Sequence, residues 1–294
     1  MKNEKDSNVT GAGEIIETVL NDIDKRKPNE IIGLPTGFLE LDGMLSGLQD
    51  GNLIVAAGHP GTGTTALALR IAEHLSIDKE IPTLYFSMGL GKERLIERML
   101  LGRALIDLRE AREGKIDSED KDSIKKTSKE ISKKPLYVDD TDRLDPGELR
   151  DTASRLKNKE GIGFIVVDSL QLMRLGKKID LKEKDFAEIA RVLKMMAREL
   201  NLPVLLLVEL SFELIRDDEE RVAPRLADLG EAIGVERYAD VLMLLNREGY
   251  YGFCPPDSKR TEIVISKNRN GAIGSVYLDF HDVFARFEDL DRLF

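Results

Sequence analysis

The chain alternates short apolar runs with segments whose apolar residues recur at helical spacing. The candidate strands are the continuous apolar runs Leu53–Ala57, Thr83–Phe86, Leu136–Val138, Phe164–Val167, Val204–Val208 and Val241–Leu245. Continuous apolar character is typical of strands that helices cover on both faces of a parallel sheet. The helical segments between them lie near 64–76, 91–105, 145–159 and 184–200. This alternation predicts a doubly wound α/β domain with a mostly parallel sheet flanked by helices.

Both ends of the chain depart from this alternation. Three strand-like runs, Glu262–Ser266, Ser275–Phe280 and Phe284–Phe287, predict an antiparallel extension at the C-terminus. Residues 1–13 are polar and indicate a flexible leader, whereas residues 14–26 have an apolar stripe at helical spacing and predict a short helix.

A break rich in glycine and proline follows this helix. We therefore divide the chain into a leader with a linker helix over 1–32 and one α/β domain over 33–294. The charged stretch 107–134 fits a solvated helical excursion from that domain.

Composition narrows the class of protein. Apolar residues make up 41% of the 294 residues, which is too much for an intrinsically disordered chain. No apolar run approaches the roughly 20 residues of a membrane span, and the N-terminus lacks the apolar stretch of a secretory signal. We therefore expect a cytoplasmic protein with no membrane contact. The net charge of -10 argues against coating nucleic acid through bulk charge but leaves a local basic site open.

Few side chains are suited to metal or thiol chemistry. Cys254 is the single cysteine, which excludes an internal disulfide and a multi-cysteine metal site. The three histidines, His59, His74 and His281, show no ligand spacing, and we interpret them as structural or surface residues.

A glycine-rich loop follows the first candidate strand and precedes a helix. Its sequence runs from Gly58 to Thr65 as GHPGTGTT. Glycines allow backbone N–H groups to converge on a phosphate, and the N-terminus of the next helix favours an anion. Gly58, Gly63 and Thr65 match the pattern GxxxxGK[ST], and Gly61 adds a further glycine. An ordinary glycine-rich turn explains this coincidence of strand, spacing, hydroxyl and helix less well.

The loop lacks the lysine of that pattern, because Thr64 stands in its place. A lysine there offsets the negative charge that develops in phosphoryl transfer, whereas threonine offers one neutral hydrogen bond. The loss of a charge-assisted bond costs roughly 1.5–3 kcal/mol in binding. Thr65 can still offer its hydroxyl to Mg²⁺, and Asp168, at the end of a buried strand, can hold the same ion through water. A helix cap is the alternative interpretation of Asp168.

Several further segments occur in the order and spacing of one protein family. They are GLPTGF at 33–38 with LD at 41–42, GLQDGNLI at 47–54, KERLIER at 92–98, PLYVDDT at 135–141, DSLQLM at 168–173, ADV at 239–241 and KNRNG at 267–271 with Gly274. From about residue 14 to the end, the chain resembles the RecA-fold motor domain of DnaB-type replicative DNA helicases. From the extent of the resemblance we expect the family's N-terminal collar domain to be absent.

The resemblance implies assembly and ligands. Family members form hexameric rings around single-stranded DNA and bind ATP with Mg²⁺ between neighbouring subunits. Residues 14–26 would be the linker helix that packs on the next subunit. Lys267 and Arg269 would reach across the interface to the γ-phosphate held by that neighbour.

Four positions depart from the family pattern. Thr64 replaces the loop lysine, and Gly89 stands where a glutamate activates the attacking water. Glu209 replaces a glutamine that senses the γ-phosphate, and Gly230 replaces an arginine of the loop associated with DNA. Glycine cannot act as a general base, a role worth about 10²–10⁴ in rate. Glu209 would bring negative charge toward the phosphates.

These departures predict a catalytically impaired paralogue that binds ATP weakly and acts as an accessory or regulatory subunit in DNA replication. Its partners would be subunits of the same family, in a homo-oligomeric or a mixed ring, with weak binding of single-stranded DNA. The alternative is a functional ATP-dependent 5'-3' DNA helicase in which other residues, such as Lys92 or Lys267, supply the missing charge. A recombination-type RecA relative is a third class, which the family-specific segments disfavour.

Overall fold

The computed structural model describes residues 10–26, 31–210, 224–247 and 259–290. The predicted leader before residue 10, Cys254 and the last four residues lie outside these ranges.

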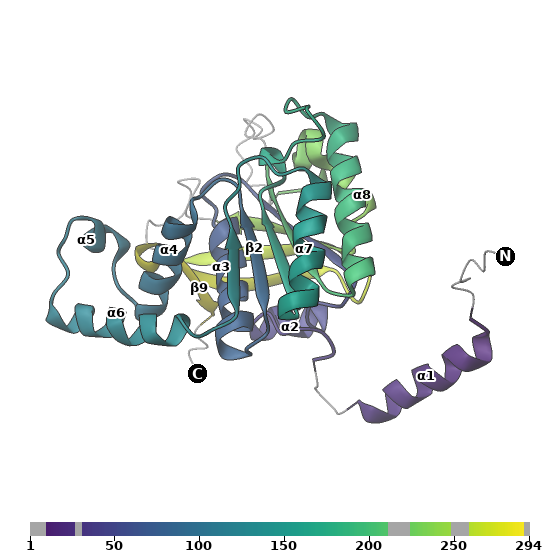
Figure 1. The fold of residues 1–294 in the computed structure, drawn as a ribbon, viewed down its shortest axis with the longest axis horizontal. Helices are drawn as coiled ribbons and strands as arrows, with labels where there is room; N and C mark the ends of the chain where they lie inside the picture. The colour runs from purple at the N-terminus through teal and green to yellow at the C-terminus, as the bar shows by residue number, and fades with distance from the viewer. Residues whose placement is uncertain (1–9, 27–30, 211–223, 248–258, 291–294) are drawn as a thin grey trace.

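A nine-stranded sheet forms the centre of the molecule, in the order β3-β2-β4-β5-β1-β6-β7-β8-β9 (Figure 1). The strands are β1 (Leu53–Gly58), β2 (Thr83–Ser87), β3 (Leu136–Asp139), β4 (Phe164–Asp168), β5 (Val204–Glu209), β6 (Val241–Arg247), β7 (Arg260–Asn268), β8 (Gly274–His281) and β9 (Arg286–Asp289). Neighbours from β3 to β6 pair in parallel, and the pairs from β6 to β9 are antiparallel. The predicted fold class is therefore confirmed.

Two helical layers cover the faces of the sheet. The α-helices are α1 (Ala12–Lys25), α2 (Leu39–Leu45), α3 (Thr64–Glu73), α4 (Lys92–Ala104), α5 (Leu108–Arg112), α6 (Ser118–Ile131), α7 (Pro146–Glu160) and α8 (Glu183–Leu200). The shorter helical turns are η1 (His74–Asp78), η2 (Leu170–Leu172), η4 (Leu226–Arg237) and η6 (Asp282–Phe284). Helices α7 and α8 with η4 bury their apolar residues on one face of the sheet. Helices α2, α3 and α4 do so on the other face.

Most predicted elements match the structure to within a few residues. The largest difference concerns Phe284–Phe287, which was expected to be a strand. The structure places Phe284 in η6 and starts β9 at Arg286, because Ala285 adopts a left-handed conformation (φ 46°) that reverses the chain. Likewise, the helix expected over 64–76 ends as an α-helix at Glu73 and continues as the π-helical turn η1.

The charged stretch after residue 107 forms two helices at the edge of the molecule (Figure 1). Asp107 caps α5 by accepting hydrogen bonds from two backbone N–H groups. Asp117 and Asp120 form a capping box at the start of α6, in which each side chain accepts a hydrogen bond from the other residue's N–H group. Apart from Thr127, the residues of α6 are exposed or only partly buried, as expected for a solvated excursion.

Helix α1 projects away from the sheet (Figure 1). Its apolar residues, namely Ile15, Ile16, Val19, Leu20 and Ile23, are each about half exposed, at 47–55%. A helix with such an apolar face normally buries it against another surface. Among the helices in the described parts of the chain, none is long and apolar enough to cross a bilayer.

Candidate nucleotide site

The glycine-rich loop lies at the carboxyl end of the central parallel strand. It leaves β1 at Gly58 and enters α3 at Thr64. A Cβ atom on Gly58 would lie 2.4 Å from the Thr62 hydroxyl, so only glycine fits there. That hydroxyl donates to the His59 carbonyl (2.7 Å), as does the Thr62 N–H (3.0 Å). The loop is therefore closed by its own short-range hydrogen bonds.

Two more glycines allow the backbone to turn. Gly61 and Gly63 have φ values of 86° and 105°, a region that residues with a side chain rarely adopt. A Cβ atom on Gly63 would also lie 2.9 Å from the ring of Phe287, which is fully buried. The antiparallel extension thus packs directly beneath the loop. With the N-terminus of α3, this geometry suits a phosphate group.

The predicted metal ligands are brought together. Asp168 ends β4, and its carboxylate accepts a hydrogen bond from Thr65, in the first turn of α3. Burial raises the pKa of Asp168, while hydrogen bonds from Tyr85 and Thr65 partly oppose this effect. These oxygens suit Mg²⁺, which is usually held by one or two carboxylates together with phosphates. In the described ranges, no cluster of three or more histidine, cysteine or acidic residues offers a complete metal site.

Tyr85 is a neighbour of Asp168 that the sequence pattern did not reveal. It is fully buried, and its hydroxyl donates to the carboxylate of Asp168 at 2.9 Å. Burial and the negative charge of Asp168 raise the pKa of Tyr85 well above 10.0, so its hydroxyl keeps its proton at neutral pH. Tyr85 therefore orients the carboxylate that faces Thr65.

We expect Tyr85→Phe to lower the free energy of unfolding by about 1.5–3 kcal/mol, because a buried carboxylate would lose a hydrogen-bond donor. Chemical denaturation followed by circular dichroism measures this. Tyr137→Phe is the matched control, since its hydroxyl donates to Glu160 (2.9 Å) in a less buried place. Equal losses for the two variants would show that Tyr85 has no special role beside Asp168.

The departures at 89 and 209 lie at the same edge of the sheet. Gly58 and Glu209 are in register on β1 and β5, so residue 209 lies beside the loop. Its backbone is held by the Gln171 side chain, which donates to its carbonyl (2.8 Å) and accepts from its N–H (3.1 Å). The charge of Glu209 also helps to raise the pKa of Asp168, although less than burial does. Gly89 is exposed, just after β2.

Lys267 and Arg269 lie toward the opposite ends of the strands from the loop. Lys267 pairs with Leu242 on β6, whereas Gly58 pairs with Leu245, about 10 Å further along the strands. The ammonium group of Lys267 donates to the Glu236 carbonyl (2.6 Å), and burial lowers its pKa. Arg269 forms an ion pair with Asp240 (3.4 Å). The structure does not bring these two residues to the loop of their own chain.

Two other predicted positions are accounted for by local structure. Lys92 forms an ion pair with Asp140 (3.3 Å), which follows the edge strand β3. Three strands separate β3 from β1, so Lys92 lies far from the loop. Gly230 lies within η4 with φ 52° and ψ −123°, a conformation that favours glycine.

Arg247 is a second residue near the loop that was not predicted. It ends β6, the strand beside β1, and its guanidinium lies 3.5 Å from the Gly61 carbonyl. The same group stacks over the Phe280 ring, 4.4 Å from its centroid, and pairs with Asp282. The sequence shows that Arg247 ends a predicted strand. Its nearness to the loop could be predicted only by knowing that this strand lies beside β1.

Comparison with known proteins places this geometry in context. The family model for the DnaB-like helicase C-terminal domain matches residues 33–289. The chain is 34% identical over 281 residues to the replicative DNA helicase DnaB of Leifsonia xyli, covering 94% of this chain and 61% of that protein. It is 37% identical to that of Pasteurella multocida over 265 residues, covering 89% and 56%. The chain thus spans about three fifths of the length of these relatives.

Solved structures of related proteins have the same fold. One ATPase domain superposes with a TM-score of 0.89 at 29% identity, covering 97% of this chain and all of that one. A DnaB-like replicative helicase, studied together with its interactions with primase, gives a TM-score of 0.88 at 30% identity, covering 96% and 69%. The similarity therefore includes both the loop and the antiparallel extension.

Proposed function

Because the chain belongs to the family of DnaB-like helicase C-terminal domains, we propose that it acts in DNA replication as a catalytically impaired accessory or regulatory subunit. The observation that carries this proposal is the combination of a formed phosphate loop with the residues around it. Gly58, Gly61 and Gly63 shape the loop, but Thr64 and Gly89 offer no charge or base, and Glu209 adds a negative charge. With this role we also propose a cytoplasmic location.

Different groups of this chain would bind the phosphates and the metal ion. Backbone N–H groups of the loop and of the start of α3 would bind phosphates, while Thr65 and Asp168 would hold Mg²⁺. Bound Mg²⁺ would offset part of the phosphate charge. Gly89 cannot accept a proton from water, so a bound nucleotide would remain largely intact and would serve assembly rather than motion.

Lys267 and Arg269 support a role toward a neighbouring subunit. Both lie toward the opposite ends of the strands from the loop, so we propose that they act on the nucleotide of another subunit rather than on that of their own. We propose that the chain assembles with copies of itself, or with active family members in a mixed hexameric ring, and that it binds single-stranded DNA weakly.

Nucleotide affinity tests the proposed function. We expect a labelled ATP analogue with Mg²⁺ to bind with a dissociation constant weaker than about 1 μM, because loss of a charge-assisted bond at 64 costs roughly 10- to 100-fold. A fluorescence titration measures this constant. Sub-micromolar binding would contradict the proposal, and the absence of saturable binding at millimolar nucleotide would exclude any nucleotide role.

Assembly depends on the exposed apolar face of α1. We expect Ile16→Glu combined with Leu20→Glu to abolish oligomers, since each apolar side chain contributes about 1.5–3 kcal/mol when fully buried. Sedimentation velocity measures the change. The control places the same charges at Thr18 and Asn21, polar positions of the same helix. An unchanged sedimentation coefficient for the apolar-face variant would exclude a role of α1 in assembly.

A further inference from the structure

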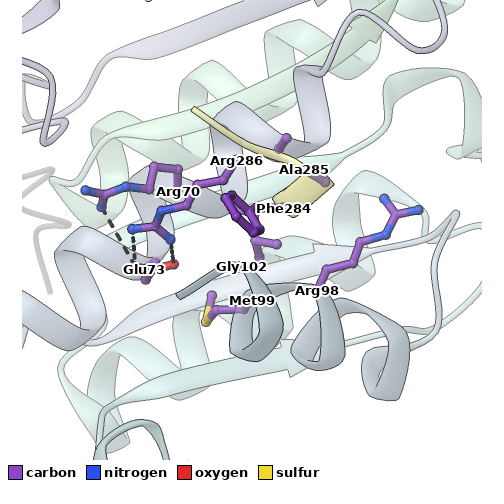
Figure 2. Close-up of a pocket in the computed structure, with 10 residues that line it drawn as sticks. Arg70, Glu73, Arg98, Met99, Gly102, Phe284, Ala285 and Arg286 are labelled. Atoms are coloured by element: carbon purple, nitrogen blue, oxygen red, sulfur yellow. Dashed lines mark hydrogen bonds and ion pairs between the residues drawn. The ribbon is translucent and has the colours of Figure 1, made fainter. Parts of the chain in front are cut away.

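Among the departures from the family pattern, Glu209 alone adds a charged group. Its side chain is exposed at the end of β5, and it forms no ion pair with any residue that the structure describes. Two arginines that pack on α3 are engaged elsewhere, since Figure 2 shows Arg70 and Arg286 turned toward Glu73, the last residue of that helix. The carboxylate of Glu209 is therefore available to a cation from solution.

Three hydrogen bonds fix Glu209 between the phosphate loop and the segment that follows β4. On one side, the Leu210 N–H donates to the Gly58 carbonyl (3.0 Å), so the end of β5 lies against the start of the loop. On the other side, the Gln171 side chain donates to the Glu209 carbonyl (2.8 Å) and accepts from its N–H (3.1 Å). Gln171 comes three residues after Asp168, so these bonds hold Glu209 beside the carboxyl end of β4.

The carboxylates of Asp168 and Glu209 project from the same face of the sheet. Alternate residues of β4 and β5, up to Val166 and Leu207, belong to the core that α3 covers. Because side chains alternate along a strand, Asp168 and Glu209 continue these two rows toward the first turn of α3. The hydrogen bond from Thr65 to Asp168 agrees with this direction.

The strand register sets the spacing of the two carboxylates. Val167 pairs with Leu206, so Glu209 lies two residues beyond the position that is level with Asp168. With strands about 4.8 Å apart and about 3.3 Å per residue, the two Cβ atoms are roughly 8 Å apart. An aspartate and a glutamate can both reach a cation across this distance, since each Mg²⁺–oxygen bond adds about 2.0–2.1 Å. Mg²⁺ is usually held by one or two carboxylates and keeps waters or phosphates as its other ligands.

We propose that Glu209 is a ligand of the divalent cation that Thr65 and Asp168 hold, so that this chain binds Mg²⁺ through two carboxylates before a nucleotide arrives. The inference rests on the proposed nucleotide site and adds a metal ligand to it. Without metal, Glu209 repels the phosphates, whereas with metal its charge is neutralised. The affinity for nucleotide therefore depends on the cation more strongly than it would with an uncharged residue at 209.

Binding of Mn²⁺, which shares the preference of Mg²⁺ for oxygen ligands, tests the inference without nucleotide or turnover. Electron paramagnetic resonance measures bound Mn²⁺ for the wild type, Glu209→Gln and Glu110→Gln. We expect Glu209→Gln to weaken binding at least about tenfold, because glutamine keeps the size of the side chain and the backbone hydrogen bonds but loses the charge. Glu110→Gln removes an exposed carboxylate on α5 and should leave the affinity within about twofold.

Nucleotide affinity separates this role from simple repulsion. Glu209→Gln should strengthen binding of a labelled ATP analogue about threefold or more in EDTA, and by less with saturating Mg²⁺. Absence of bound Mn²⁺ in the wild type, an unchanged Mn²⁺ affinity in Glu209→Gln, or equal gains in the two nucleotide titrations would overturn the inference and leave the proposed function standing. Binding of Mn²⁺ that depends on Glu209, in a chain that binds no nucleotide, would support the metal ligand and contradict the proposed function.

Discussion

Replacing Thr64 by lysine and Gly89 by glutamate is expected to raise ATP turnover at least about a hundredfold over the wild type. A positioned general base contributes about 10²–10⁴ in rate, and a cation at the phosphates stabilises the charge of the transition state further. Position 89 lies close to the candidate metal site, because the neighbouring Met88 N–H donates to the Asp168 carbonyl (2.8 Å) and so fixes the end of β2 beside β4.

The backbone at position 89 tolerates a side chain. A Cβ atom there would meet only the Leu172 Cδ1 atom, at 2.9 Å, and the end of a leucine can shift. Phosphate release at saturating nucleotide and single-stranded DNA measures turnover. Thr64→Lys with Gly89→Gln is the matched control, since glutamine has the same size but accepts no proton. If the glutamate variant binds nucleotide and hydrolyses no faster than the glutamine variant, the account of the lost base fails.

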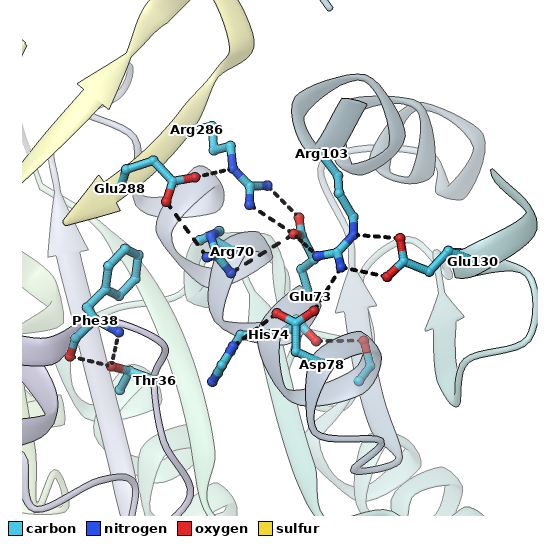
Figure 3. Close-up of polar contacts among 12 residues, drawn as sticks. Thr36, Phe38, Arg70, Glu73, His74, Asp78, Arg103, Glu130, Arg286 and Glu288 are labelled. Atoms are coloured by element: carbon cyan, nitrogen blue, oxygen red, sulfur yellow. Dashed lines mark hydrogen bonds and ion pairs between the residues drawn. The ribbon is translucent and has the colours of Figure 1, made fainter. Parts of the chain in front are cut away.

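A second large effect is expected at Glu73. Its carboxylate is almost fully buried, with 2% side-chain exposure, and joins the phosphate-loop helix α3 to α4 and β9 through Arg103 (2.7 Å) and Arg286 (2.8 Å) (Figure 3). Without it, Arg70, Arg103 and Arg286 would face one another in a largely buried place. Removal of one partner from a buried ion pair costs roughly 3–5 kcal/mol. That is a large share of the roughly 5–15 kcal/mol that holds a typical domain together.

We therefore expect Glu73→Gln to lower the free energy of unfolding by about 3 kcal/mol or more, measured by urea denaturation. Glu130→Gln is the matched control. Glu130 pairs with the same Arg103 at 2.8 Å but is 45% exposed, so its loss should cost about 1 kcal/mol or less. Equal stabilities of the two variants would show that the cluster around Glu73 is not a structural centre.

The sequence was sufficient for the architecture because each parallel strand is buried on both faces. Continuous apolar runs such as Val204–Val208 and the glycine spacing around Gly58 are local signals that need no knowledge of the fold. The start of β9 was misplaced because Phe284 and Phe287 look alike in a sequence, whereas the turn at Ala285 depends on backbone conformation.

The side chains around the site could not be predicted in the same way. Tyr85 and Arg247 come from β2 and β6, and they meet Asp168 and the loop only through the strand order. The roles of Lys267 and Arg269 rested on family resemblance alone and stay a prediction.

Hydrolysis of ATP by the unmodified chain, with and without single-stranded DNA, tests most directly whether the nucleotide site has lost its catalytic groups. We predict a rate far below about 1 s⁻¹, the lower end of ordinary enzymes, with little change when DNA is added. Turnover of about 1 s⁻¹ or faster that rises on addition of DNA would contradict the account and would favour a working helicase with substituted residues.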